Sequence, residues 1–256
     1  MNWIAIARRT QSLMPRRLVV PARMLAFRAR ALMYRGDAVW CPCCGGRYSR
    51  FLDVGLPPRA AACPGCDSRE RQRLLHLYLR NETNLFSDPL RVLHIAPEDC
   101  LQATIAGLRN VDYVSADISP SAAMMRMDVT DIHLPDNSFD VILCSHVLEH
   151  VGDDGRAMRE LRRVLRPGGW AILQVPIDAS RERTFEDPAV IDPAQRERLF
   201  GQWDHVRVYG RDYAQRLADA GFDVEVVPYA IRLGQDAIRA CGLDAAERIH
   251  LCRKPA

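Results

Sequence analysis

From residue 90 onward, short apolar runs alternate with segments that have a helical apolar period. Runs that fit buried strands occupy residues 90–96, 111–119, 139–147 and 170–176. Amphipathic segments of helical period occupy residues 100–110, 153–169 and 212–222. Because parallel strands need long crossovers between them, this alternation predicts a doubly wound α/β sheet.

Two places depart from a regular alternation. A third strand at 125–132 follows the second after only the five residues 120–124, whereas a parallel crossover usually needs about a dozen. Either the connecting helix is cut to a single turn or this strand is irregular. The last two predicted strands, 223–229 and 247–254, lack a full buried-helix crossover pattern, which is compatible with an antiparallel edge pair.

The N-terminal part has a different pattern. Residues 1–36 read as one or two basic amphipathic helices, broken near Pro15 and Pro21. Residues 37–70 are rich in Cys, Pro and Gly, and residues 71–89 contain a linking helix. The predicted organisation is therefore a helical arm, a small module, a linker and an α/β domain over 90–256.

Composition and charge narrow the class of protein. The chain has 256 residues, of which 48% are hydrophobic and 26% charged, as in soluble globular proteins. The sequence has neither an apolar run of about 18 residues nor a recognisable signal peptide, so the expectation is a cytoplasmic protein without a transmembrane segment.

The charge is unevenly distributed. Residues 1–36 carry eight arginines and no acid; since the whole chain carries +3, residues 37–256 sum to −5. A wide nucleic-acid footprint on the body is therefore not expected, although the arm is able to supply one. An arm packed on the body is favoured, and contact with RNA or a membrane surface is the alternative.

Two cysteine pairs have metal-ligand spacing. Eighteen residues separate the pairs, which are Cys41-x2-Cys44 and Cys63-x2-Cys66. This spacing predicts a closed, structural four-thiolate zinc site, with Gly45 and Gly65 permitting the tight turns. Reduced or redox-active thiols are the alternative, and Cys43 is a spare thiol able to replace Cys44.

Polar residues follow four successive predicted strands. In a doubly wound sheet, these carboxyl ends form the ligand site. Asp117, at the end of the second strand, is placed to accept both hydroxyls of a ribose, and Asp128 after the third to accept an exocyclic amino group. The candidate cofactor-binding residues are His94, Ala96, Pro97, Glu98, Asp117, Ile118, Asp128, Val129, Cys144 and Ser145.

Two blocks carry a resemblance to a known family. The "LPDNSFDVI…VLEH" block and the "LRRVLRPGG" block resemble the class I S-adenosylmethionine-dependent methyltransferases, and the resemblance covers residues 90–253. It implies a Rossmann-like, mostly parallel seven-stranded sheet, S-adenosylmethionine as the methyl donor, and adenosine contacts by Asp117 and Asp128.

The first motif of that family is altered here. The family pattern resembles D-x-G-x-G-x-G, and the corresponding positions hold His94, Ala96, Glu98 and Cys100. S-adenosylmethionine has no phosphate for a glycine loop to bind, but its ammonium group suits a carboxylate at Glu98. Pro97 would set the turn that glycines usually allow.

Acceptor-side residues are expected after the fourth strand and in a long connection at about 178–210. Long ordered connections of this kind often bind substrates or form lids. His205 is the leading candidate for a general base, with His146 and Tyr209 as further catalytic candidates. A structural or supporting role is expected for His150.

Three functions compete at this point. The first is methyl transfer to an O, N or S atom of a small-molecule acceptor. The second is methylation of an RNA base, with docking through residues 1–36 and the zinc module; ribosomal RNA guanine methyltransferases have a similar architecture but a different cysteine spacing. The third is a non-catalytic donor-binding or scaffold protein. For the altered motif alone, the alternative is a decayed donor site that leaves a fold without chemistry.

Overall fold

The computed structural model describes residues 16–55, 57–119 and 123–256, which fall into two compact units. The first unit comprises the described part of Met1–Leu77 together with Leu233–Ala245; the second comprises Tyr78–Arg232 and Ala246–Ala256. Residues 233–245, expected to belong to the α/β domain, are thus part of the N-terminal unit. None of the described helices has the length and apolar character needed to cross a membrane.

The first unit consists of helices and two short hairpins. Its elements are α2 (Arg16–Met33), β1 (Arg35–Trp40), β2 (Arg47–Tyr48), β3 (Leu52–Val54), β4 (Arg59–Ala62), the start of α3 (Glu70–Glu82) and the end of α8 (Tyr229–Cys241). The expected break near Pro21 is wrong, because α2 runs through this proline as its sixth residue. A proline inside a helix removes one i→i−4 backbone hydrogen bond, yet α2 continues beyond Pro21 to Met33. Pro15 lies outside the described residues.

A buried arginine ties the C-terminal segment to this unit. Arg73 is fully buried and donates to the carbonyl oxygens of Cys241 (2.6 Å), Gly242 (2.7 Å), Ser68 (2.6 Å) and Ala61 (2.8 Å). Burial lowers the pKa of Arg73, and these carbonyl contacts compensate the cost of burying its charge. The same arginine therefore explains why residues distant in sequence fold with the N-terminal module.

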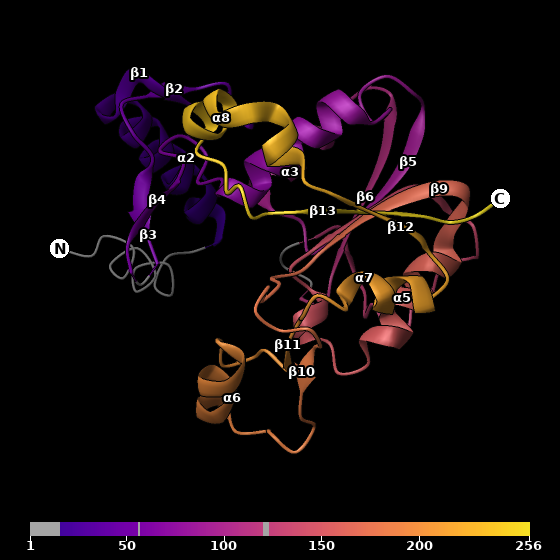
Figure 1. Cartoon of the computed structure of the whole chain (residues 1–256). Coiled ribbons are helices and arrows are strands. Elements are labelled where there is room, and N and C mark those ends of the chain that lie inside the picture. The colour runs from indigo at the N-terminus through magenta and orange to yellow at the C-terminus, as the bar shows by residue number, and fades with distance from the viewer. Residues whose placement is uncertain (1–15, 56, 120–122) are drawn as a thin grey trace. The chain divides into compact units, whose positions relative to one another are not determined.

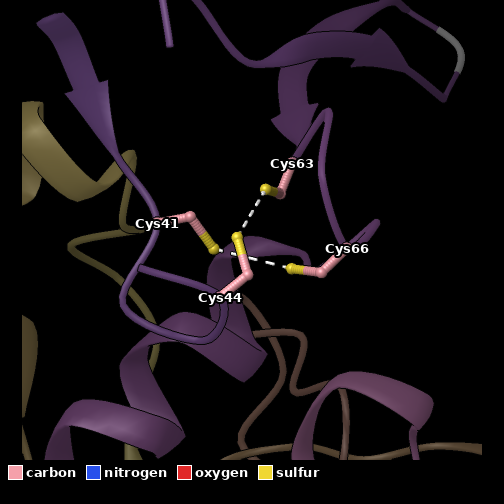
Figure 2. A group of neighbouring side chains, drawn as sticks. All are labelled: Cys41, Cys44, Cys63 and Cys66. Carbon is pink, nitrogen blue, oxygen red and sulfur yellow. Dashed lines mark hydrogen bonds between the residues drawn. The ribbon is translucent and has the colours of Figure 1, made fainter. Parts of the chain in front are cut away.

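Two tight turns in this unit hold the paired cysteines (Figure 2). In the first turn Gly45 N–H donates to the carbonyl of Cys41 at 2.8 Å, and in the second Asp67 N–H donates to that of Cys63 at 2.9 Å. Gly45 and Asp67 both have positive φ, at 71° and 62°. The second turn thus places Asp67 where the first has a glycine. Gly65 serves a different need, because a Cβ there would lie 2.0 Å from the Tyr48 hydroxyl.

A seven-stranded sheet forms the second unit (Figure 1). Its order is β12-β13-β9-β8-β5-β6-β7, and within it only β13 runs against the other strands. The bounds are β5 (Leu90–Ile95), β6 (Val111–Asp117), β7 (Met125–Arg126), β8 (Phe139–Ser145), β9 (Leu165–Gln174), β12 (Asp223–Val227) and β13 (Ile249–Arg253). This confirms the predicted mostly parallel, doubly wound sheet of Rossmann-like type.

The two irregular places resolve differently. The third strand is shortened to Met125–Arg126, so residues 127–132 do not continue it as predicted; Asp128 Oδ1 instead accepts hydrogen bonds from the Thr130 N–H and hydroxyl, both at 2.8 Å. The last two strands do pair antiparallel. However, β13 inserts between β9 and β12, so of these last two strands β12 alone lies at an edge of the sheet.

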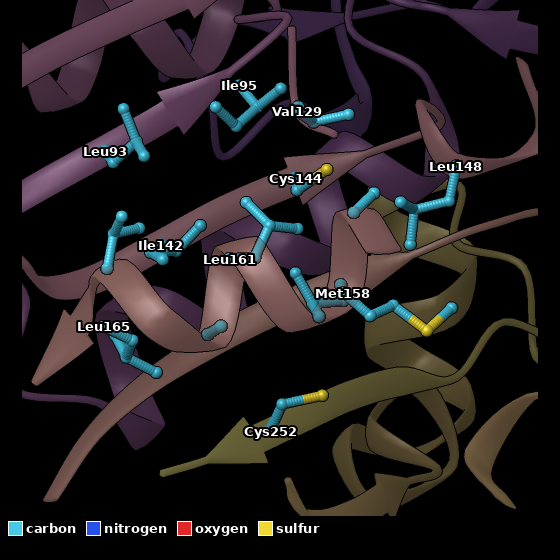
Figure 3. Close-up of a cluster of buried hydrophobic side chains, with 14 of the residues drawn as sticks. Leu93, Ile95, Val129, Ile142, Cys144, Leu148, Met158, Leu161, Leu165 and Cys252 are labelled. Carbon is cyan, nitrogen blue, oxygen red and sulfur yellow. The ribbon is translucent and has the colours of Figure 1, made fainter. Parts of the chain in front are cut away.

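The core of the second unit lies between the sheet and two helices, α5 (Asp154–Val164) and α7 (Tyr213–Asp219), which lie side by side (Figure 1). Buried residues of α5 recur at helical spacing, at Ala157, Met158, Leu161 and Val164, and pack against side chains of β5 and β8 (Figure 3). Burial of each large side chain contributes about 1.5–3 kcal/mol. This packing holds β5 and β8 side by side, and the candidate site lies at their carboxyl ends.

Candidate functional site

The strand order reverses between β5 and β8. β5 pairs with β6 on one side and with β8 on the other, all parallel, so the three carboxyl ends meet at one edge. Such a reversal opens a crevice in which doubly wound proteins bind their ligands. The residues predicted to bind a cofactor follow these strands.

The turn after β5 brings together His94 and Glu98. The side chain of His94 is 1% exposed; its Nε2 lies 3.2 Å from Glu98 Oε2 and its Nδ1 lies 3.0 Å from the hydroxyl of Tyr113. Burial, and then the Glu98 carboxylate, raise the pKa of Tyr113. The sequence predicted the two turn residues but gave no signal for Tyr113, which β6 supplies through strand pairing.

Ala96 stands at the first glycine position of the expected motif and adopts a glycine-like conformation. Its φ is 47°, in the left-handed region, and its N–H donates to the Ala116 carbonyl at 2.8 Å. The turn therefore keeps the backbone shape that glycine favours, at an energetic cost to alanine. Helix α4 (Asp99–Ile105) begins directly after Glu98.

The acids after β6 and β7 occupy turns. Asp117, half-buried, accepts a hydrogen bond from Ser119 N–H on Oδ1 at 2.6 Å, and Ile118 beside it is 60% exposed. Asp128 is exposed, and its hydrogen bonds from Thr130 hold the pKa of its carboxyl below the usual value. Val129 is buried in the core.

The last two residues of β8, at the carboxyl edge of the sheet, are side chains predicted to bind the cofactor. Cys144 and Ser145 are both buried. Burial raises the pKa of the Cys144 thiol, and the carboxylates of Glu149 and Glu98 raise it further. Cys144 is therefore close enough to feel the charge of Glu98, which follows β5, and of Glu149, which follows β8. A buried, neutral thiol at this position fits a packing role.

The residues after β8 form a second polar group. His146 has a φ of 56°, which is uncommon for a side chain of this size, and its Nδ1 lies 3.2 Å from Glu149 Oε1. Glu149 belongs to the short helix η1 (Leu148–His150) and its side chain is 1% exposed. Glu149 Oε2 and His146 Nε2 are buried and have no hydrogen-bond partner among the described residues.

The 178–210 connection places His205 beside this group. It contains β10 (Phe185–Glu186), α6 (Pro193–Phe200) and β11 (Arg207–Val208). The rings of His150 and His205 lie edge to face with centroids 4.7 Å apart. His150 Nδ1 lies 3.3 Å from Asp204 Oδ2, and His205 Nδ1 lies 3.1 Å from the Phe200 carbonyl oxygen. His146 and His205, both predicted from sequence, are thus joined by Glu149 and His150.

Arg207 fixes the two loops against each other. Its buried guanidinium donates to the carbonyl oxygens of Leu148, Val151 and Gly152, and to Glu186 Oε2 at 2.8 Å. In addition, Val206 N–H donates to the Glu149 carbonyl at 2.9 Å. These bonds set the position of His205 relative to η1.

Tyr209 lies in the protein interior, where it is bonded to a buried acid. Its side chain is fully buried, and its hydroxyl donates to Asp154 Oδ2 at 2.8 Å. Burial, and then the Asp154 carboxylate, raise the pKa of Tyr209. Arg216 completes the cluster with two nitrogens on Asp154, the shorter contact being 2.7 Å. This burial argues against the catalytic role predicted for Tyr209.

The four paired cysteines of the first unit converge. Sγ atoms lie 3.6 Å apart for Cys41 and Cys66, and 3.7 Å apart for Cys44 and Cys63 (Figure 2). Four thiolates about 2.3 Å from a zinc ion in a tetrahedron would lie about 3.8 Å apart. Cys43 points elsewhere, since its thiol lies 3.6 Å from the Gln72 carbonyl. The four sulfur atoms are therefore spaced as ligands of one tetrahedral metal ion. Cys43 does not take the place of Cys44 among them.

Comparisons with known proteins bear on the second unit. Residues 100–173 match the family described as "Methyltransferase domain". An uncharacterized methyltransferase of Mycobacteroides abscessus is 36% identical over 131 residues, which is 51% of this chain and 41% of that protein. These matches make part of the chain similar to methyltransferases.

Two further proteins are similar to parts of this chain. The 27-O-demethylrifamycin SV methyltransferase of Amycolatopsis mediterranei is 31% identical over 114 residues, or 43% of this chain and 39% of that protein. A solved S-adenosylmethionine-dependent methyltransferase of Mesorhizobium loti is 21% identical, with a TM-score of 0.47 over 70% of this chain and 98% of that chain. The chain spans less than half the length of the two curated relatives named here.

Proposed function

We propose that the protein transfers a methyl group from S-adenosylmethionine to an O, N or S atom of a small-molecule acceptor. One observation carries the proposal: Glu98 and Asp117 follow neighbouring parallel strands at the edge where the strand order reverses. A carboxylate at Glu98 suits the donor's ammonium group, and one at Asp117 suits its ribose hydroxyls.

The donor needs alignment more than activation. A sulfonium is already a good leaving group, so holding donor and acceptor in line and excluding water supplies much of the acceleration. His205 is half-buried, and its Nδ1 faces a carbonyl oxygen, so the proton on that ring lies on Nδ1. Nε2 is then free to accept a proton or to bind a ligand.

A small acceptor agrees with the charge and with the connection at 178–210. The body of the chain is acidic, which disfavours a polyanion as acceptor. The exposed Trp203, next to Asp204 in the connection, offers a flat apolar surface for a ring-containing molecule. The rifamycin relative, whose name indicates a small-molecule acceptor, supports the same class.

Donor binding tests the proposal directly. We expect calorimetric titration with S-adenosylmethionine to show binding that Asp117→Asn weakens by about tenfold to 100-fold, the range of one charge-assisted hydrogen bond. Asp112→Asn is the matched control, because Asp112 lies on the same strand but is exposed and paired with Arg91. Equal binding by both variants would remove the assigned ribose contact, and tight binding without turnover on any acceptor would favour the non-catalytic scaffold.

We infer that the cysteine cluster holds a structural zinc ion. With all four positions filled by thiolates, the ion would have no open position for catalysis. Its contribution would be to fold a segment whose hairpins are too short to build a core alone.

RNA methylation remains the second candidate on one observation. Helix α2 has five arginines and no acid over Arg16–Met33. Turnover of labelled donor against cell extract, split into small-molecule and RNA fractions, separates the two acceptor classes.

A further inference from the structure

A group of metal-ligand side chains lies beside the donor edge, apart from the cysteines. Glu149, His150 and His205 each offer a ligand atom, and these atoms all lie within 4.8 Å of one another. All three belong to the second unit. They come from η1 and from the 178–210 connection, which the Arg207 guanidinium holds together.

The two imidazoles are oriented as ligands usually are. His150 Nδ1 faces the carboxylate of Asp204 at 3.3 Å, and His205 Nδ1 faces the carbonyl oxygen of Phe200 at 3.1 Å. Both partners accept hydrogen bonds, so each ring carries its proton on Nδ1 and keeps the Nε2 lone pair. This arrangement, with one nitrogen held by an oxygen and the other left for an ion, is typical of metal-binding histidines.

Glu149 supplies an independent reason to expect a cation. Its carboxylate is almost fully buried; Oε1 lies 3.2 Å from His146 Nδ1, and Oε2 has no hydrogen-bond partner among the described residues. Burying a carboxylate without full compensation costs several kcal/mol. A cation between Glu149 Oε2 and the two imidazoles would supply that compensation.

We propose that Glu149, His150 and His205 bind a divalent transition-metal ion such as Mn²⁺ or Zn²⁺. Two imidazoles and one carboxylate are donors that these ions accept, and three protein ligands leave coordination positions open. Ligand bonds of about 2.0–2.2 Å place any two ligand atoms of one ion within about 4.4 Å of each other, so the group would contract on binding.

The open positions indicate a class of acceptor. η1 follows the carboxyl end of β8, at the same sheet edge as the proposed donor site. If the proposed methyl transfer is correct, on which this step depends, the ion would hold an acceptor by adjacent oxygen atoms, as in a catechol or an α-hydroxy acid. Chelation of two oxygens would fix the acceptor's orientation toward the donor.

Mn²⁺ binding to the full chain, without donor or acceptor, tests the site. Free Mn²⁺ is measured by electron paramagnetic resonance during titration. Thiolates select zinc rather than manganese, so the cysteine cluster does not interfere. We expect one Mn²⁺ site in the unaltered chain, and at least about tenfold weaker binding in His205→Ala and in Glu149→Gln.

His133→Ala is the matched control, because His133 is 88% exposed and contacts only the exposed Asp131 among the acids of the described residues. Glu149→Gln preserves side-chain volume and decides the question if His205→Ala fails to fold, as judged by thermal melting. Equal Mn²⁺ affinity in the unaltered chain and Glu149→Gln, or no Mn²⁺ binding at all, would overturn the site. Since S-adenosylmethionine binding is measured separately, such a failure would leave the proposed methyl transfer standing.

Discussion

Ala96 shows how a motif can lose its glycine and keep its backbone. A φ of 47° costs an L-residue about 1–2 kcal/mol, whereas glycine adopts it freely. Ala96→Gly relieves that cost but makes the unfolded chain more flexible. We therefore expect unchanged or slightly higher stability in urea denaturation.

Ala103→Gly provides the comparison, since Ala103 is exposed within helix α4. There the same substitution should lower the free energy of unfolding by about 1 kcal/mol. Equal losses at both positions would contradict the assigned strain at Ala96.

Glu98 is the residue on which the altered donor loop depends. Its Oε2 already interacts with His94, so the carboxylate is held in place before the donor's ammonium group arrives. Glu98→Ala should weaken S-adenosylmethionine binding by about tenfold to 100-fold in calorimetry. Cys100→Ala, in the first turn of α4, should change it far less, and the reverse order would exclude the proposed ammonium contact.

At the scale of elements, the insertion of β13 between β9 and β12 buries a histidine. His250 is buried beside the Tyr213 ring, and burial lowers its pKa from 6.5 to about 4. Between those values the unfolded chain binds one proton more than the folded chain, so stability falls as the pH drops from 6.5 toward 4. The loss should reach about 3 kcal/mol.

His250→Leu should remove most of this acid sensitivity in denaturation series across that pH range. His133→Gln, at an exposed position, should retain it. An unchanged slope in His250→Leu would show that other groups cause the acid loss.

The two cysteine turns form the element most open to a direct metal test. We expect the zinc content per chain, measured by atomic absorption, to fall by one ion in Cys66→Ser and to stay unchanged in Cys43→Ser, because the Cys43 thiol faces Gln72 rather than the cluster. Loss of zinc should also lower the melting temperature, since metal binding supplies folding energy to such modules. An unchanged zinc content in Cys66→Ser would exclude the four-thiolate site.

Local patterns explain which of these features could be predicted from sequence. The strands, the cysteine spacing and the acid at Asp117 depend on nearby residues and on one period, so the sequence shows them directly. The contact of Arg73 with residues 241–242 spans the chain, and no local signal indicates it. The role of Asp67 in the second turn was also not predicted, because a left-handed aspartate has no distinctive sequence pattern.

The group of Glu149, His150 and His205 was predictable from sequence only in part. The adjacent pair Glu149–His150 is visible in the sequence, where it belongs to the block that carries the family resemblance, and only a structural or supporting role is expected for His150. Its meaning depends on His205, more than fifty residues away, and on the Arg207 guanidinium that holds the two loops together. His205 was predicted from sequence as a candidate base, but its proximity to Glu149 and His150 is visible only in the fold.

At the scale of the whole molecule, charge separates the N-terminal arm from the acidic body. The eight arginines of residues 1–36 contrast with the −5 of residues 37–256. Arg30 already has partners within its own unit, in the Pro64 carbonyl and the Asp67 carboxylate. Changing Arg30 would therefore also disturb contacts inside the first unit, so Arg30 is left unaltered when the arm's function is tested.

A chain with Arg8, Arg9, Arg16, Arg17 and Arg23 replaced by glutamine tests the arm without removing α2. Because the proposed donor and acceptor residues all belong to the second unit, we expect unchanged methyl transfer to the small-molecule fraction of cell extract. Retention of RNA at low salt, if the unaltered chain shows it, should fall, since each neutralised phosphate contact contributes to salt-dependent affinity. Turnover that is confined to the RNA fraction, and is lost in this variant, would instead favour RNA as the acceptor. Methyl transfer to RNA is the case that needs a docking surface outside the second unit.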